Sequence, residues 1–214
     1  MRYGVQDIVQ SVKIALDENK VSEALIEEAD VDTLTLNEII ESKIVDAVKT
    51  VVLDAPHYML DSGSPFGESI SWQSSVGYGA GSIFLPDDFL RLVIFKMSDW
   101  SYPITEVITD SHPLYKQQFS RFPGIKGNPQ KPVVAITSQS GGRVLQFFSC
   151  TAGESVTVEQ ASYIPIPSIK DDMVEIGSRL YPAVIYHIAH LVLLSIKEAD
   201  AAAIMLNTSK ELLR

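Results

Sequence analysis

The pattern of apolar and polar positions predicts helices at both ends of the chain. Apolar residues between Val5 and Leu16 recur at offsets of three and four, as they do on one face of a helix. A second face of this kind runs from Ile40 to Val51, and Thr35 and Glu38 precede it at the spacing of a capping box. Because proline cannot continue a helix, this second helix is expected to end shortly before Pro56.

The middle of the chain follows a strand pattern. Six short segments are rich in Val, Ile, Thr and Phe and are bounded by turn residues: SIFLP, LRLVIFKMS, PITEVIT, KPVVAITSQ, RVLQFFSC and ESVTVEQASYIPIP. Ser-Gly-Gly between Gln139 and Arg143 predicts a close hairpin. LRLVIFKM is apolar on both faces, so we expect a central strand that the preceding LPDD sets off by a turn. A long excursion, residues 110–131, interrupts the strands.

Helical spacing returns towards the end of the chain. Pro182 suits the first turn of a helix that continues to Ile196, and AAAIMLNTSKELL predicts another. The run from Leu180 to Ile196 holds two His and a Pro and falls short of the roughly twenty residues that cross a bilayer. It therefore predicts a buried helix, and no membrane is expected as a partner.

These elements predict an α+β protein in three segments. Residues 1–60 form N-terminal helices, residues 61–168 form a β-domain containing the 110–131 excursion, and residues 169–214 form C-terminal helices that pack on the N-terminal ones. The six short strands of the middle segment make either a sandwich or a small barrel.

Composition and charge narrow the classes of function. With 46% hydrophobic and 21% charged residues, the chain matches ordinary globular proteins and not disordered ones. Its 17 basic and 27 acidic residues give a net charge of −10, which disfavours a grip on nucleic acid. A field of that sign could instead let DNA pass close by without sticking, although solubility explains an acidic chain equally well.

The metal-ligating residue types are few. The single Cys150 excludes an internal disulfide and any multi-cysteine site, and its apolar neighbours predict a buried, inert thiol. His187 and His190, with Glu198 nearby, raise the alternative of a metal-assisted hydrolase, but they offer only two nitrogens. Hydrogen-bonded core histidines are the favoured interpretation, and no metal is expected.

No other motif selects a catalytic residue or a cofactor. GYGAGS, from Gly77 to Ser82, is followed by a predicted strand, whereas a dinucleotide site needs a helix there, so a flexible turn is expected. No serine stands in a nucleophile elbow. The carboxylate pairs Asp87–Asp88 and Asp171–Asp172 precede predicted elements, where capping and solvation explain them. The chain is therefore not expected to be an enzyme.

Aromatic residues are the candidates for contacts with other molecules. Trp100 and Tyr102 lie in DWSYP, which is expected to be an exposed turn, and local packing explains them as well as an interface does. Tyr115, Phe119 and Phe122 lie in the excursion. All five are candidate subunit or partner interface residues. In an alternative function, a ligand-binding β-module with a helical lid, the last three line a site gated by the excursion.

The order of motifs from Ile83 to Pro167 resembles the head–tail connector proteins, also called adaptor or ring proteins, of short-tailed and crAss-like bacteriophages. The segments that carry the resemblance are IFLPDDFLRLVIFKMSDW, YPITEVI, HPLYKQQF, PVVAITSQSGGRVLQFF and ASYIPIP, with AVIYHIAHLVLL and EADAAAIMLNTSKELL after them. Leading and closing helices follow the order of that family, so the resemblance covers nearly the full chain.

The resemblance implies a non-catalytic structural protein of the virion, assembled in the cytoplasm of the host bacterium. Such proteins form a ring, commonly of twelve subunits, below the portal and join the capsid to the tail. The implied partners are copies of the chain itself, the portal protein, downstream tail or ring proteins, and genomic DNA that passes through without sequence-specific binding. The fold that the resemblance implies is a helical bundle formed by both chain ends and packed beside an antiparallel β-sandwich-like domain. The resemblance supplies no active-site motif.

Overall fold

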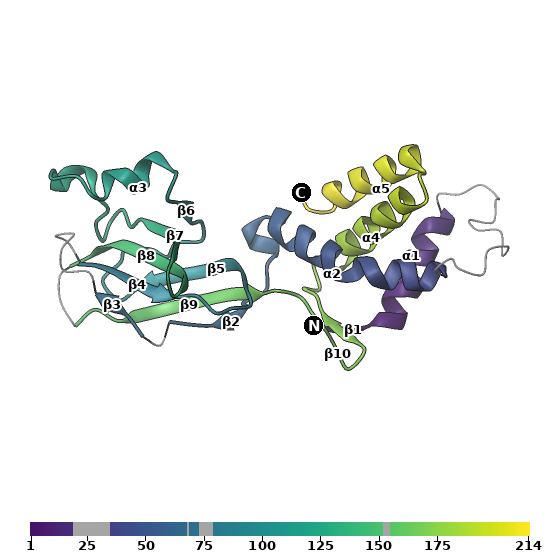
Figure 1. The fold of residues 1–214 in the computed structure, drawn as a ribbon, viewed down its shortest axis with the longest axis horizontal. Coiled ribbons are helices and arrows are strands. Elements are labelled where there is room, and N and C mark those ends of the chain that lie inside the picture. Colours follow the sequence, from purple (N-terminus) through teal and green to yellow (C-terminus); the bar gives the residue numbers. More distant parts are fainter. Residues whose placement is uncertain (19–34, 68, 73–78, 152–154) are drawn as a thin grey trace. The chain divides into compact units, whose positions relative to one another are not determined.

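The computed structural model describes residues 1–18, 35–67, 69–72, 79–151 and 155–214. The acidic stretch after the first helix and the start of the glycine-rich GYGAGS lie outside the described residues. The chain is an α+β protein that divides into two compact units (Figure 1). One unit, here called the helical unit, combines Met1–Asp61 with Ile166–Arg214, and the other, the β-unit, is Ser62–Pro165.

The described residues of the helical unit form four long helices and a small sheet. The helices are α1 (Val5–Glu18), α2 (Leu36–Asp54), α4 (Tyr181–Ser195) and α5 (Ala199–Glu211). β1 (Arg2–Gly4), β10 (Ile169–Lys170) and β11 (Met173–Glu175) form an antiparallel sheet in the order β1-β11-β10. A 3₁₀ turn, His57–Met59, follows α2.

Helix α2 begins at the predicted capping box. The Thr35 hydroxyl accepts a hydrogen bond from the backbone N–H of Glu38, and the Glu38 carboxylate accepts one from the backbone N–H of Thr35 at 2.7 Å. These bonds satisfy two backbone donors that a helix start otherwise leaves unpaired. The Thr35 hydroxyl also donates to the Glu38 carboxylate at 2.8 Å, and this bond, followed by the one from the Thr35 backbone, lowers the pKa of Glu38. The helix ends at Asp54, so both predicted ends are confirmed.

Helix α4 holds the helical unit together. It contacts α1, α2 and α5, and residues all around it are buried, among them Val184, Ile188 and Val192. A helix that is apolar on every side must be surrounded by protein, as the sequence predicted for this run. Within the described residues, no helix has both the length and the hydropathy that crossing a membrane requires.

The strands described in the β-unit form two sheets. The first has the order β2-β9-β5 and is antiparallel, with β2 (Ser64–Pro65), β9 (Val158–Pro165) and β5 (Phe89–Met97). The second has the order β3-β4-β8-β7-β6, with β3 (Ser71–Trp72), β4 (Gly79–Phe84), β8 (Gly142–Cys150), β7 (Val134–Gln139) and β6 (Ile108–Thr109). Among the described strands of this unit, only β6 and β7 pair in parallel.

The two sheets of the β-unit share one core. Phe89 and Phe95 of β5 meet Leu145 and Phe147 of β8 in a cluster of buried side chains. The rings of Phe95 and Phe147 lie 5.9 Å apart between centroids. The predicted hairpin is confirmed, because β7 and β8 pair up to Gln139 and Gly142 around a two-residue loop.

Three predictions for the β-unit are wrong in detail. Strand β5 lies at the edge of its sheet, where β9 is central, and a single bridge from Phe95 to Ile104 borders it. PITEVIT was expected to be one strand, but it forms only the short β6. Its start, at Ile104, bridges to Phe95 of the first sheet, and its end pairs with β7 of the second sheet. The described end of GYGAGS, from Gly79 onward, is strand and not turn.

The glycine at position 81 has a packing reason. A Cβ atom placed on Gly81 would lie 2.4 Å from Cζ of Phe147, a ring that is completely buried in the core. Only a residue without a side chain lets the strand pass this close to the ring.

The acidic turn before β5 also has a structural role, since Asp88 accepts a hydrogen bond from the Tyr163 hydroxyl at 2.8 Å.

We expect Gly81→Ala to destabilise the protein by about 1–3 kcal/mol, because the added methyl group would force Phe147 out of a filled core. The free energy of unfolding in urea measures the effect. Gly124→Ala is the matched control, since a Cβ there meets nothing within 4 Å. Equal losses of stability in the two variants would contradict this role for Gly81.

Candidate interaction surface

The excursion between β6 and β7 is anchored to the outer face of β8. Its short helix α3 (Pro113–Gln117) carries Tyr115, and the rings of Tyr115 and Phe119 lie 5.8 and 5.7 Å from that of Phe148. The Tyr115 hydroxyl donates a hydrogen bond to Gln146 Oε1 at 2.9 Å. Phe148 points away from the Phe147 side because successive residues of a strand face opposite sides.

Buried hydrogen bonds also fix the shape of the excursion. Gln118 is buried, and its amide donates to the carbonyl of Leu114 and accepts from the backbone N–H of Gly127, both at 2.8 Å. The Ser149 hydroxyl accepts from the N–H of Val133 at 2.6 Å. A buried amide that is bonded through both its nitrogen and its oxygen favours one conformation, because leaving either partner unpaired costs free energy.

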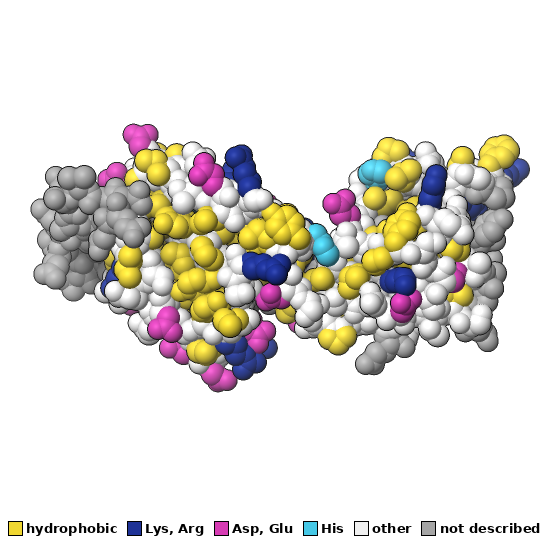
Figure 2. Space-filling view, turned by 180° about the vertical axis from the view of Figure 1, so that it is seen from behind, with side chains coloured by type: hydrophobic (Ala, Val, Ile, Leu, Met, Phe, Trp, Pro, Cys, Tyr) yellow, Lys and Arg dark blue, Asp and Glu magenta, His cyan; other side chains and the backbone are white. Residues whose placement is uncertain are grey.

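Although it is anchored, the excursion exposes apolar side chains. Phe122 is 74% exposed and Phe119 is 51% exposed, and Leu114 and Ile125, the latter in the 3₁₀ turn Pro123–Ile125, are also exposed. We call these four residues the excursion surface. In Figure 2, hydrophobic and basic side chains lie next to each other at the upper right, over the end of the β-unit that carries α3 in Figure 1. Clustered exposed apolar groups mark contact sites more often than chance exposure does.

The five aromatic candidates separate in the structure. Tyr115, Phe119 and Phe122 share the excursion, and Tyr102, which is 45% exposed, lies two residues after Trp100. Trp100 itself is only 3% exposed, so the expectation that it lies on an exposed turn is wrong. The backbone bond from Trp100 N–H to the Met97 carbonyl turns the chain back, and the indole packs against Phe95.

Leu114 and Ile125 were missed as members of this surface. Both are common aliphatic residues, and nothing in their spacing separates them from core positions. The available signal was their place in a segment bounded by Pro and Gly that is neither helix nor strand along most of its length. An apolar residue in such a segment either covers an edge or faces solvent, and only the three-dimensional structure tells which.

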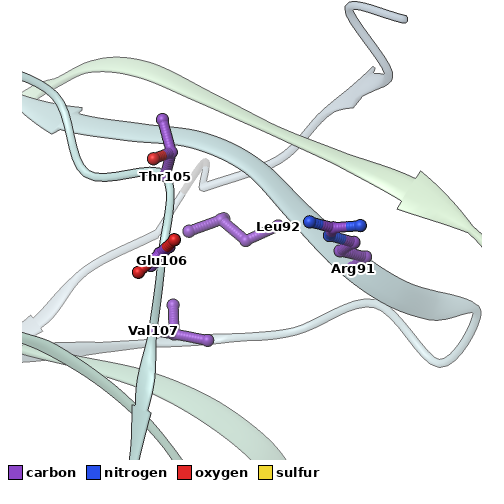
Figure 3. A pocket seen from close by; sticks show the side chains of 5 residues that line it. All are labelled: Arg91, Leu92, Thr105, Glu106 and Val107. Carbon is purple, nitrogen blue, oxygen red and sulfur yellow. The ribbon is translucent and has the colours of Figure 1, made fainter. Parts of the chain in front are cut away.

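A small pocket lies elsewhere in the β-unit. It has a volume of about 260 Å³ and is lined by Arg91, Leu92, Thr105, Glu106 and Val107. Figure 3 shows that the first two come from β5 and the other three from the segment before β6, with Leu92 and Glu106 pointing toward each other. None of the residues that the ligand-binding alternative places around its ligand lines this pocket.

Cys150 is buried at the end of β8, as predicted. Burial, followed by the nearby negative charge of Asp99, raises the pKa of the thiol to about 12. Such a thiol carries almost no thiolate at neutral pH and is a poor nucleophile. Asp99 is itself engaged, because it accepts hydrogen bonds from the backbone N–H and the hydroxyl of Thr151.

The two helical histidines lie in the interior of the helical unit. His190 donates from Nδ1 to the carbonyl of Ala202 at 2.8 Å, and the two imidazole rings are 5.6 Å apart. Burial, followed by the proximity of His190, lowers the pKa of His187, while Asp54 acts in the opposite direction. Across the described residues, no group of three or more His, Cys, Asp or Glu side chains could hold a metal ion.

No protein-family model matches the chain, and no curated protein matches it in sequence.

We expect the helical unit to be less stable in mild acid than at neutral pH, because of His187. Because the folded state lowers its pKa below the ordinary value of 6.5, the unfolded chain takes up a proton first as the pH falls. The contribution of neutral His187 is therefore fully present above pH 6.5 and is lost as the pH falls below it. His187→Gln should flatten the dependence of unfolding free energy on pH in this window.

His112→Asn is the control for this experiment, since His112 is exposed and asparagine can also cap α3. Urea unfolding at a series of pH values gives the comparison. If the wild-type and His187→Gln profiles stay parallel from pH 7.5 down to 5, the proposed effect of burial on His187 is refuted.

Proposed function

We propose that the chain is a non-catalytic structural protein of a tailed-bacteriophage virion, which forms a ring below the portal and joins the capsid to the tail. Its partners in this proposal are copies of itself, in a ring of twelve, the portal protein, and downstream tail or ring proteins. Genomic DNA passes through the ring without sequence-specific binding. The protein assembles in the host cytoplasm and acts in the virion.

The main support for the proposal is that the excursion surface is ordered and yet exposed. Hydrogen bonds and ring contacts hold the excursion in one arrangement, yet Phe119 and Phe122 are half or more exposed to solvent. Ordering a segment costs conformational entropy, and an ordered segment that exposes aromatic rings is prepared for binding protein. A connector subunit needs surfaces of this kind for its neighbours, the portal and the tail.

The architecture agrees with the order of elements that the resemblance implies. The proposed fold has a helical bundle contributed by both chain ends beside a β-sandwich. In support, helices from both ends belong to one compact unit, with α4 in contact with α1 and α2, and the two sheets of the β-unit share a core.

The charge of the chain supports passage of DNA. The helical unit carries 10 basic and 19 acidic side chains in its sequence, out of 17 and 27 in the chain, so nearly all of the net charge of −10 belongs to it. An acidic wall repels the phosphates and forms few of the contacts that release counterions and hold DNA. A channel lined in this way lets DNA slide.

Electron microscopy of the purified full chain, alone and with the portal protein encoded by the same genome, tests the proposal. We expect closed rings, which form on the portal if not in its absence. Mixing the chain with an unrelated portal protein is the control. A chain that remains monomeric both alone and with its own portal would rule out the connector function.

A further inference from the structure

The excursion has the opposite charge to the rest of the chain. Residues 110–131 contain four basic side chains, Lys116, Arg121, Lys126 and Lys131, and one acidic side chain, Asp110. Taking these from the 17 basic and 27 acidic side chains of the protein leaves 13 against 26. A segment with a net charge of +3 therefore belongs to a molecule that is otherwise at −13.

The positive charges alternate with the exposed apolar residues. Lys116 lies between Leu114 and Phe119, and Arg121 is directly followed by Phe122. Both basic side chains are exposed, as are the apolar ones. The anchoring on Phe148 and Gln118 fixes this mixture in place, so the excursion surface is a positively charged apolar patch with one geometry.

The helical unit offers a surface of the opposite kind at its β10–β11 hairpin. Asp171 and Asp172 form the tip, and exposed Ile169, Lys170 and Met173 flank it. Both aspartates adopt positive φ, 51° and 60°, as a two-residue hairpin loop demands. Asn-Gly is the usual solution at such a tip, so two aspartates place negative charge there at some conformational cost.

We propose that the excursion surface docks on the β10–β11 hairpin of a second copy of this chain. The excursion surface carries Lys116 and Arg121 among exposed apolar groups, and the hairpin carries Asp171 and Asp172, against a single Lys170, beside Ile169 and Met173. An excess of opposite charge on the two sides favours one partner and one orientation. The contact joins two different patches, so it is heterologous and propagates from copy to copy until it closes. The inference rests on the proposed ring and specifies its subunit interface.

A second copy fits the excursion better than a polyanion does. DNA or an anionic membrane would attract the excursion but would repel the remaining −13 of the chain. A neighbouring copy presents negative charge and apolar surface at one place. It is also always available, because its concentration is that of the protein itself. Nucleic-acid affinity also depends on many contacts between basic side chains and phosphates, and the excursion has only four basic side chains to make them.

Charge reversal in the full chain tests the contact. Analytical ultracentrifugation over a concentration series, at low and high salt, should show self-association of the wild type that salt weakens. Lys116→Glu with Arg121→Glu should weaken it about tenfold or more. The matched control, Lys49→Glu with Lys210→Glu, makes the same change of net charge at exposed positions of α2 and α5 and should leave it unchanged.

The hairpin allows a variant that should fold at least as well as the wild type. Asp171→Asn with Asp172→Gly removes both charges and installs the preferred residues for this loop. We expect stability to be maintained while self-association falls about tenfold. Asp46→Asn with Glu211→Gln is the control, because it removes two exposed carboxylates from other parts of the helical unit and should have no such effect.

Cross-linking identifies the two surfaces directly. A Phe122→Cys chain mixed with a tagged Met173→Cys chain should give a disulfide-linked dimer. An Ile204→Cys partner should not, although Ile204, on α5, is more exposed than Met173. Cys150 is buried and should not compete.

The inference is overturned if the wild type stays monomeric, if either charge variant assembles as the wild type does, or if the two cysteine partners cross-link equally. It is also overturned if the excursion variant loses binding to phosphatidylserine vesicles or to a DNA duplex while its self-association is intact. If the variant with Lys116→Glu and Arg121→Glu still forms rings, the connector function is supported but this interface is refuted. If assemblies form through the excursion but never close into rings, the interface is supported but the connector function is refuted.

Discussion

Strand β8 is the element on which the β-unit depends, because both of its faces are buried. Every residue from Val144 to Cys150 is buried. Phe147 points into the core between the sheets, and Phe148 points to the opposite side, where Tyr115 and Phe119 cover it. One strand therefore closes the core and anchors the excursion, so the position of the exposed rings depends on the packing of the core.

Within the excursion, the side chains that hold the fold differ from those that face the solvent. Tyr115 and Gln118 use their polar groups to hold the excursion, whereas Phe122 has most of its surface in solvent. In the proposed contact, such a segment would lose little entropy on docking, because its backbone is already ordered. Its affinity would then depend on the exposed side chains and their charges, which can vary without disturbing the fold.

Local features were predictable from the sequence because their causes lie within a few residues. The Thr35–Glu38 box begins α2, and Ser-Gly-Gly forms a hairpin, since each needs only neighbouring groups. Long-range pairing was not predictable: β1 pairs with β11, with Arg2 opposite Glu175, although neither segment has a strand pattern of its own. The burial of Trp100 likewise depends on Phe95 and Phe147, which only the fold brings close.

The candidate surface was predictable in part. Aromatic residues in a long connection pointed to Phe119 and Phe122, because amphipathic loops with rings often bind protein. Their aliphatic neighbours Leu114 and Ile125 became visible only from their exposure. The complementary hairpin at Asp171 and Asp172 carried an acidic pair in the sequence, but its flanking apolar exposure and its positive φ angles are properties of the folded chain.

Hydrogen–deuterium exchange of the full chain tests most directly the claim that an ordered excursion works by binding protein. The account predicts that amides of residues 114–127 are already partly protected in the dilute chain and become more protected as assembly proceeds, while those of α4 do not change. Full exchange of this segment in the dilute chain, or assembly that leaves its protection unaltered, would contradict the account.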